Sequence, residues 1–340
     1  MVVHERRAEA ADDLLLLADV ARQYYLEDMT QEQIAQRIGV SRSNVSRMLK
    51  DARERGVVEI RIHHPLRTVP ELRAALVGRL GLADCLVLAT PDPAAGPGGE
   101  PVPTVPQQLG ALAARYLQEQ VAEGSVVGVG WGSTVYHVVT SGYLRRKPGT
   151  SVVQLMGSVG GATPDIDGGQ VAGRLGRALG ARVYYLHAPM VVTDAGVRAG
   201  LLRDQHIRKT LEMARRAQTL LVSVGAVTQA SGIYRAGYLG DVDLEHIQGQ
   251  GAVGDICGSF FRLDGSRCSL ELEERTIAVT ADVMRTAPLR VGVGWGEAKA
   301  LPSVGAVRAG LVNVLIIDEE AAKAMLAILD REGGDRPAAA

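Results

Sequence analysis

The sequence predicts two unlike parts, a small all-helical N-terminal domain followed by a larger α/β domain with a mostly parallel sheet. Apolar residues recur at helical spacing between residues 14 and 52, whereas Val- and Ile-rich strand patterns alternate with helical patterns from residue 85 onward. A chain of 340 residues is long enough for a little over two domains of ~150 residues. Pro65 and Pro70 mark the linker, so we place the domains at residues 1–64 and 65–335.

The composition is that of an ordinary globular protein and excludes several other classes. It is 46% hydrophobic and 22% charged, which argues against intrinsic disorder. The longest apolar runs, 14–17 and 312–317, are much shorter than the ~20 residues of a membrane span, and the N-terminus lacks a secretory signal pattern. We therefore expect a cytoplasmic protein with no membrane partner. Three cysteines without CxxC spacing predict neither disulfides nor a zinc site, and no other metal or cofactor is expected.

Helical periodicity predicts three helices in the first domain. The first is expected from about Asp12 or Asp13 to Tyr25. Thr30 and Gln33 form a capping-box pattern that opens the second helix, and Gly39 ends it. Ser41 caps the third helix. The buried positions expected in the second and third helices are Ile34, Ala35, Ile38, Val45, Met48, Leu49 and Ala52.

The outer face of the third helix is polar and basic. Residues 37–55 contain six basic and two acidic side chains, although the whole chain has a net charge of −1. Two helices joined by a short turn containing Gly39, with such a face, are typical of a helix-turn-helix that binds double-stranded DNA. Residues 58–63 alternate like a short strand and predict a wing. The predicted DNA-binding residues are Gln31, Ser41, Arg42, Ser43, Asn44, Ser46, Arg47 and Lys50.

Two other interpretations of this segment remain open. A basic helical hairpin can be merely solvated, and some helix-turn-helix domains bind proteins instead of DNA. The agreement of both caps, the turn, both apolar stripes and the polar face favours DNA binding.

The second domain is predicted to alternate helices and strands. The expected helices are 71–80, 107–122, 134–145, 170–179, a stretch within 195–216, 241–248, 273–285, 297–309 and 319–329. The expected strands are 85–88, 126–129, 152–156, 183–185, 219–224, one around 260–262, 289–293 and 312–317. Residues 90–106 contain six prolines and three glycines and are expected to be a loop. This alternation predicts a parallel sheet covered on both faces.

One glycine-rich motif occurs twice, as VGVGWG at 127–132 and again at 291–296. Each copy ends a predicted strand and precedes a helix, where free backbone N–H groups favour an anion such as phosphate. Ser133 and Thr134 follow the first copy, and Lys299 follows the second. A third loop, with Gly157, Ser158 and Gly160, also follows a strand. We expect all three loops at the carboxyl edge of the sheet, where ligands of such folds bind.

Ordinary structural roles are alternatives for each of these residues. Glycine turns are common in βα proteins, Lys299 could be solvated, Asp255 could be a turn acid and Gln170 a helix-start residue. We interpret His137, His187, His206 and His246 as incidental. The predicted effector-binding residues are Gly130, Trp131, Gly132, Ser133, Thr134, Gly157, Ser158, Gly160, Gln170, Asp255, Trp295 and Lys299.

Nearly the whole chain resembles the SorC family of bacterial transcriptional regulators, also called the sugar-binding or central glycolytic gene regulator type. The resemblance is carried by LEDMTQEQIA at 26–35, VSRSNVSR at 40–47, GWGST at 130–134, QLMG at 154–157 and GLVNVL at 310–315. It implies an effector domain similar to glucosamine-phosphate deaminase, ribose-phosphate isomerase and CoA-transferase-like folds. It also implies a phosphorylated-sugar effector and a homo-oligomer, dimer or tetramer, on operators near carbohydrate operons.

The resemblance also implies roles for individual residues. Ser133 and Thr134 would bind the phosphate, Gln170 and Asp255 the sugar hydroxyls, and Lys299 the phosphate or another anionic group. Relatives commonly have a smaller residue where Trp295 stands, so a narrower pocket or a different ligand is expected.

The function predicted from the sequence is effector-controlled DNA binding without catalysis. The alternative is a sugar-phosphate isomerase or deaminase with an accessory helix-turn-helix, but Asp255 and Glu297 are the only acids placed near the loops and neither lies in a catalytic motif. A kinase-related repressor would need acid-glycine-threonine phosphate loops and a cysteine-rich zinc motif, and the sequence has neither.

Overall fold

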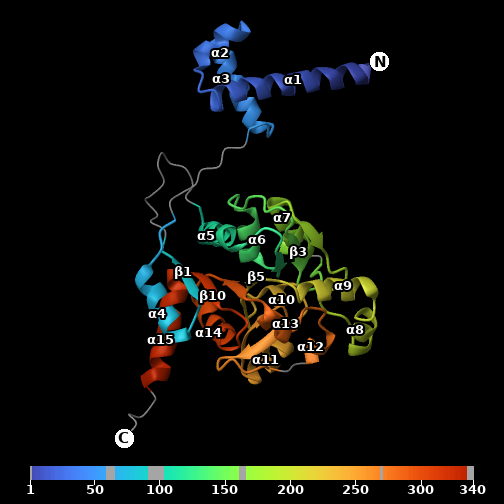
Figure 1. Ribbon diagram of the computed structural model, residues 1–340, viewed down its shortest axis with the longest axis vertical. Coiled ribbons are helices and arrows are strands. Elements are labelled where there is room, and N and C mark those ends of the chain that lie inside the picture. The colour runs from blue at the N-terminus through green and yellow to red at the C-terminus, as the bar shows by residue number, and fades with distance from the viewer. Residues whose placement is uncertain (1, 59–65, 91–102, 161–165, 269–270, 335–340) are drawn as a thin grey trace. The chain divides into compact units, whose positions relative to one another are not determined.

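The computed structural model describes residues 2–58, 66–90, 103–160, 166–268 and 271–334 (Figure 1). The chain divides into two compact units, Met1–Pro65 and Leu66–Ala340. Each unit has its own hydrophobic core, and each is described by itself.

The N-terminal unit consists of α1 (Val2–Tyr25), α2 (Gln31–Ile38) and α3 (Arg42–Glu54). The predicted caps are confirmed. The Gln33 N–H donates to Thr30 Oγ1 at 3.3 Å and the Thr30 N–H donates to Gln33 Oε1 at 2.9 Å, while the Asn44 N–H donates to Ser41 Oγ at 3.2 Å. Gly39 ends α2 with a φ of 72°, a left-handed conformation that glycine adopts without strain.

The predicted start of the first helix is wrong, because α1 begins at Val2 and not near Asp12 or Asp13. The preceding residues are mostly alanine, glutamate and arginine, which are strong helix formers, so the acidic pair does not act as a boundary. The predicted wing at 58–63 lies, apart from Val58, outside the described residues. The three helices pack through Leu17, Val20, Ala21, Ile34, Ala35, Val45, Leu49 and Ala52.

The larger unit is built on a seven-stranded sheet with the order β1-β10-β9-β5-β2-β3-β4, and every neighbouring pair is parallel. This confirms the predicted parallel sheet. The strands are β1 (Asp84–Leu88), β2 (Val126–Val129), β3 (Ser151–Gln154), β4 (Arg182–Tyr184), β5 (Thr219–Ser223), β9 (Leu289–Val293) and β10 (Val314–Asp318).

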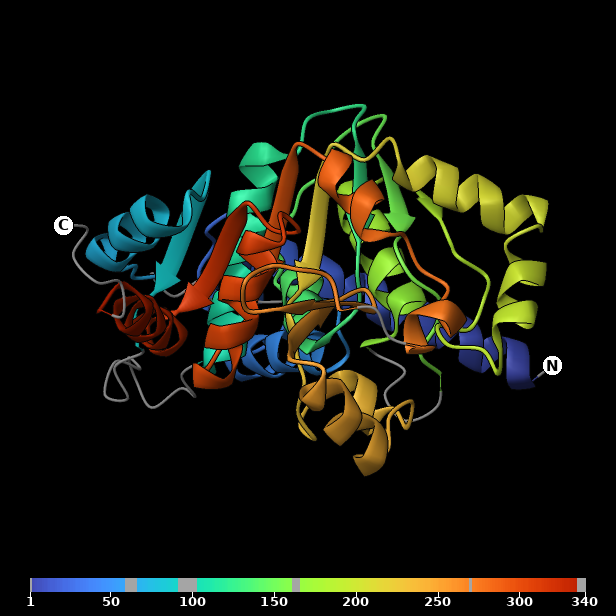
Figure 2. The same ribbon diagram turned by 90° about the horizontal axis from the view of Figure 1, so that it is seen from below.

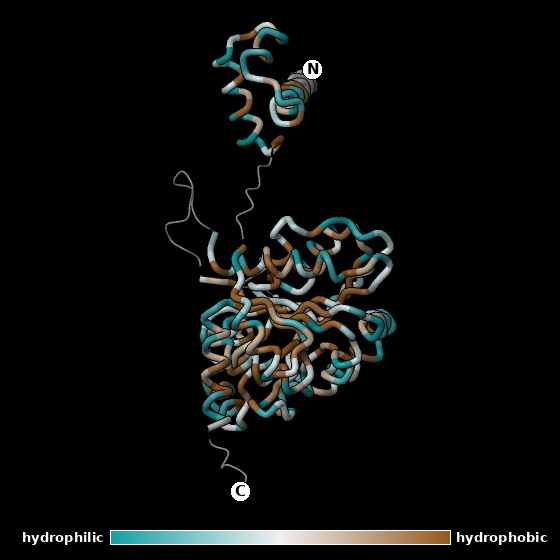
Figure 3. The backbone as a smooth tube through the Cα atoms, turned by 60° about the vertical axis from the view of Figure 1, so that its left-hand side comes forward, coloured by the Kyte–Doolittle hydropathy of each residue, from teal (hydrophilic) through white to brown (hydrophobic). Residues whose placement is uncertain are grey.

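Helices cover both faces of this sheet, as predicted. One face packs against α5 (Val105–Gln120), α6 (Ser133–Thr140) and α7 (Gly168–Leu179). The other packs against α4 (Pro70–Leu80), α9 (Gln205–Ala214), α13 (Ala281–Thr286), α14 (Ala300–Arg308) and α15 (Glu319–Gly334), and α4 and α15 lie side by side at the β1 edge (Figure 2). Leu221 of β5 points to the first face and its neighbours Leu220 and Val222 point to the second, so apolar residues gather in the interior (Figure 3).

Several short elements complete the unit. They are α8 (Ala195–Leu201), α10 (Gly232–Arg235), α11 (Asp241–Gly249), α12 (Glu271–Arg275) and the 3-10 turn η3 (Glu297–Lys299). A small antiparallel sheet has the order β6-β7-β8, with β6 (Gly225–Ala226), β7 (Ala252–Ile256) and β8 (Ser259–Arg262). Of these three strands the sequence predicted only β8. Asp255 belongs to β7, so it lies on a strand and not in a turn. In the described part of the chain, no helix combines the length and apolar character needed to cross a bilayer.

The single helix predicted over 273–285 is wrong. Two short helices, α12 and α13, are separated by an extended segment around Ile277 and Val279. The Ile277 N–H donates to Met190 O and the Val279 N–H donates to Leu155 O, both at 2.8 Å. The segment is rich in β-branched residues, which favour this extended pairing over a helix.

Gly110 gives a test of the packing between α5 and α6. A Cβ at this position would lie 2.5 Å from the backbone carbonyl carbon of His137, closer than real atoms approach. We expect Gly110→Val to lower the free energy of unfolding by about 1–3 kcal/mol, measured by denaturant titration. Gly78→Ala in α4 is the control, since no atom lies within 4 Å of a Cβ added there. We expect this variant to raise the free energy of unfolding by about 1 kcal/mol. Equal stability of the wild type and Gly110→Val would contradict this close helix crossing.

Candidate functional site

A cavity of about 470 Å³ lies at the carboxyl edge of the large sheet. Its walls include the loop after β2, from Gly130 to Thr134, and the loop after β9, from Trp295 to Lys299. The two loops meet because β2 and β9 pair with opposite sides of β5, whose last residue, Ser223, also lines the cavity. The structure therefore brings both copies of the repeated motif to one site.

The loop after β2 offers unpaired backbone donors at the N-terminus of α6. Gly132 precedes the helix with a φ of 128°, and a Cβ there would lie 3.0 Å from Cβ of Ser223. Within the described residues, no acceptor pairs with the N–H groups of Gly132, Ser133 or Thr134. Such a helix N-terminus favours an anion that accepts several N–H bonds at once.

The loop after β9 forms different hydrogen bonds, although it begins with the same Gly-Trp-Gly sequence. The Gly296 N–H donates to Oδ1 of Asp318 at 2.9 Å, and this oxygen also accepts from the Ala321 N–H at 3.3 Å. Asp318 is buried, and burial raises the pKa of its carboxyl, against the effect of these N–H bonds. The Gly296 N–H is therefore already engaged within the chain, and Lys299 is the cation that this loop contributes to the cavity.

Lys299 and Asp255 both line the cavity wall, and each electrostatically favours the charged form of the other. The Lys299 Nζ donates to the Val224 carbonyl at 2.8 Å, and burial lowers the pKa of this ammonium while Asp255 opposes the shift. Burial raises the pKa of the Asp255 carboxyl, against the Gly258 N–H at 3.1 Å and the charge of Lys299. The pair presents a donor and an acceptor of the kind that binds sugar hydroxyls.

Both tryptophans of the chain lie in the cavity wall. Trp131 packs on α10, where a Cβ at Gly232 would come within 2.8 Å of the indole. Trp295 remains 43% exposed. The two indoles are therefore placed to change their emission when a ligand enters.

The third predicted loop does not join this cavity. Ser158 and Gln170 line a separate cavity of about 440 Å³ together with Arg174 and His187. Gly157 packs closely against Pro189, because a Cβ added at Gly157 would lie only 2.4 Å from the Pro189 carbonyl oxygen. Gly160 has a φ of 75°. The structure therefore separates these four predicted residues from the other eight, which all line the first cavity.

Sequence reasoning missed part of the cavity wall, including Thr228, Ser231 and Arg235. Ser231 caps the short helix α10 by accepting from the Tyr234 N–H at 3.3 Å, and Arg235 ends that helix. The serine cap was the available signal. A four-residue helix has no apolar periodicity that would have shown it.

The N-terminal unit exposes the polar face predicted for DNA. Seven of the eight predicted residues are exposed, and Gln31 at the start of α2 is half-buried. Ser41 Oγ lies 2.8 Å from Ser43 Oγ, and Lys50 pairs with Glu54 at 3.6 Å. Arg42 and Arg47 form no ion pair with any residue that the structure describes, so both guanidinium groups can bind DNA.

These two surfaces define a class of protein, a transcriptional regulator with an N-terminal helix-turn-helix and a ligand-binding α/β domain. Residues 64–327 match the Sugar-bind family model, which describes a sugar-binding domain, and residues 11–74 match the Crp-like helix-turn-helix domain. The chain belongs to the SorC family of bacterial transcriptional regulators, as its sequence motifs indicated.

The similar proteins cover nearly the whole chain. It is 32% identical over 312 residues to the deoxyribonucleoside regulator of Bacillus subtilis, covering 92% of this chain and 97% of that protein. It is 33% identical over 320 residues to the transcriptional regulator LsrR of Enterobacter sp. strain 638, covering 92% and 93%. The crystal structure of the full-length sorbitol operon regulator SorC from Klebsiella pneumoniae shares the fold, with a TM-score of 0.67, 24% identity and coverage of 94% and 99%.

These comparisons decide between the functions predicted from the sequence. The relatives are named as transcriptional regulators, so the chain is a regulator, and the alternative of an isomerase or deaminase is not supported.

The Asp255 carboxyl predicts a pH dependence of stability. Its pKa in the folded state is above the unfolded value of 3.8, so its contribution to stability is largest at low pH and is lost as the pH rises through the folded pKa. Asp255→Asn does not titrate. We therefore expect the melting temperature of the variant, relative to wild type, to increase from pH about 4 upward and then level off.

Asp264→Asn is a control with the opposite sign. The Ser266 hydrogen bonds lower the pKa of the exposed Asp264 carboxyl, so its contribution is lost as the pH falls and the relative stability of this variant decreases as the pH rises. Parallel pH curves for wild type and Asp255→Asn would show that Asp255 does not titrate abnormally.

Proposed function

We propose that this regulator controls a carbohydrate-metabolism operon in the cytoplasm, and that a phosphorylated sugar in the cavity sets its affinity for operator DNA. The main support is that one cavity combines N–H groups at the start of α6, which have no acceptor among the described residues, with the side chains of Asp255 and Lys299. The first can bind a phosphate and the second can bind hydroxyls. The volume of about 470 Å³ is in the usual range for small-ligand sites.

The cavity supports one arrangement of this ligand. Its phosphate accepts from the N–H groups and side chains of Ser133 and Thr134, and Lys299 and Arg235 supply positive charge. Asp255 accepts from a sugar hydroxyl, and the two indoles cover apolar parts of the sugar ring. Ser158 and Gln170 have no place in this arrangement, because they line the other cavity.

On the DNA side, we propose that α3 enters the major groove. Arg47, on the middle of the exposed face, reads base edges, whereas Arg42, at the start of the helix, contacts phosphate. Gln31, Ser43, Asn44, Ser46 and Lys50 supply further contacts. The regulator acts as a homo-oligomer, dimer or tetramer, because operators with two-fold symmetry need two such helices. The ligand shifts the populations of oligomer arrangements that differ in operator affinity.

The two arginines give a test of the DNA interface. On an operator selected from random duplexes, we expect Arg47→Ala to cost about 1–3 kcal/mol of binding and to reduce discrimination against random DNA. Arg42→Ala should weaken both DNAs equally and reduce the slope of log affinity against log salt by about one unit. Equal losses on both DNAs for Arg47→Ala would exclude it from base reading.

The effector is tested by titrating the full chain with matched pairs of free and phosphorylated sugars while recording tryptophan emission. We expect saturable binding of a phosphosugar and much weaker binding of its free form. Lys299→Met should weaken that binding about 10- to 100-fold, since it removes a charged donor. Lys209→Met, at an exposed position on α9, is the matched control. The phosphate assignment is wrong if both forms of the sugar bind equally well.

A further inference from the structure

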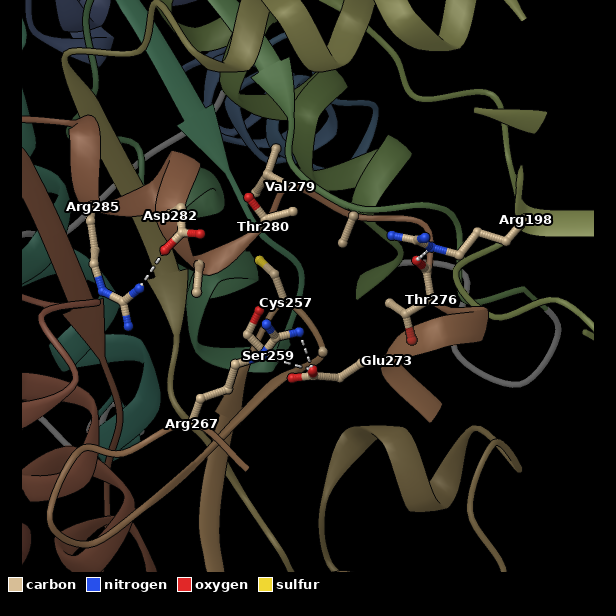
Figure 4. Close-up of a pocket in the computed structure, with 13 residues that line it drawn as sticks. Arg198, Cys257, Ser259, Arg267, Glu273, Thr276, Val279, Thr280, Asp282 and Arg285 are labelled. Carbon is tan, nitrogen blue, oxygen red and sulfur yellow. Dashed lines mark hydrogen bonds and ion pairs between the residues drawn. The ribbon is translucent and has the colours of Figure 1, made fainter. Parts of the chain in front are cut away.

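A third, smaller cavity lies beside the turn that joins β7 to β8, and no predicted function uses it (Figure 4). Its volume is about 160 Å³, against about 470 Å³ for the cavity that contains both tryptophans, so it suits a smaller ligand. Cys257 lines both this cavity and the effector cavity, and it holds a left-handed backbone with a φ of 52°. The turn is therefore the wall between the two.

The charged residues of this cavity are mostly paired with one another. Arg267 donates to Oε2 of Glu273 through Nη2 at 2.7 Å and through Nε at 3.1 Å, and Oε1 of Glu273 accepts from the Phe260 N–H at 3.1 Å. Asp282 pairs with Arg285 at 2.8 Å. Both carboxylates in the wall are therefore balanced by an arginine.

Arg198 is the exception. It reaches the cavity from α8, and its Nε donates to the Thr276 carbonyl at 2.7 Å. Within the described residues no carboxylate pairs with it, although the side chain is only half-exposed. The wall consequently contains three guanidinium groups and two carboxylates, a net charge of +1.

The polar groups approach from different elements. Figure 4 shows Arg198 on one side and Arg267 on another, with Ser259 beside the Arg267 guanidinium and Thr280 across from it. The Ser259 hydroxyl has no hydrogen-bond partner among the described residues. Guanidinium groups and a hydroxyl that surround a small space can donate hydrogen bonds to the oxygens of a tetrahedral anion.

We propose that this cavity is a second ligand site, specific for a small oxyanion such as inorganic phosphate. Arg198 supplies the uncompensated charge, and the unused N–H groups of Arg267 and the Ser259 hydroxyl supply further hydrogen bonds. The site does not depend on the sugar ligand, because it shares only Cys257 with the effector cavity.

The experiment is a calorimetric titration of the full chain with inorganic phosphate in a phosphate-free buffer. Phosphate could also enter the effector cavity, so the titration is done in the Lys299→Met background. We expect one binding event with a Kd of about 1 mM, that of a ligand held by few contacts. Adding Arg198→Gln should weaken it at least about tenfold, which is the loss of one charged hydrogen-bonding partner.

Three further variants separate binding from folding. Arg203→Gln, an exposed arginine just beyond α8, should leave phosphate binding unchanged. Arg198→Lys keeps the charge and should restore part of the binding. Ser259→Ala should weaken it with little change in melting temperature. The proposal is overturned if Lys299→Met binds no phosphate at tens of millimolar, or if Arg198→Gln and Arg203→Gln bind it equally.

Discussion

The order of three parallel strands, β9, β5 and β2, is the constraint on which the proposed effector cavity, the one lined by residues 130–134 and 295–299, depends. Thr219 and Leu221 of β5 pair with Val127 and Val129 of β2, and the same two residues pair with Leu289 and Val291 of β9. Parallel strands end at one edge, so two loops far apart in the sequence face each other there. At Gly132 an added Cβ would lie 3.0 Å from Cβ of Ser223, and the φ of 128° is one that other residues rarely adopt, so glycine is favoured at this position.

The chemistry of the cavity depends on two half-buried charged side chains that come from different parts of the chain. Asp255 comes from the small sheet and Lys299 from the turn after β9, and each stabilises the charged form of the other. A Cβ at Gly225 would come within 2.0 Å of Asp255 Oδ1, so glycine is required beside the carboxylate. Such buried polar groups discriminate strongly, because a ligand without the matching group leaves them unpaired.

Local features of the sequence predicted local structure well. The caps at Thr30 and Ser41 need only residues within one turn, and β10 contains a continuous apolar run from Val314 to Ile317. The elements that were missed depend on distant partners. β7 contains glycine and aspartate and is a strand only because it pairs with β6 and β8. α10 has four residues, too few for a periodic pattern.

The effector residues show the same limit. The glycine motif and the residues that follow it led to seven residues that line one cavity, because both copies follow strands next to β5, whereas Asp255 was implied by the family resemblance. The third loop also follows a strand, but β3 lies one position further out, and Ser158 lines a different cavity. Only the order of the strands separates these cases, and that order is set by packing across the whole sheet.

The two glycine loops also give the cavity a direction. In the loop after β9 the chain provides its own anion, the Asp318 carboxylate on the Gly296 N–H. In the loop after β2 no described residue does so, which leaves these N–H groups available to a ligand. An anion is therefore expected to accept N–H bonds from the loop after β2, while the loop after β9 contributes the side chain of Lys299. The two copies of VGVGWG thus lead into loops with unlike hydrogen bonding, and a ligand with a single charged end has one preferred orientation between them.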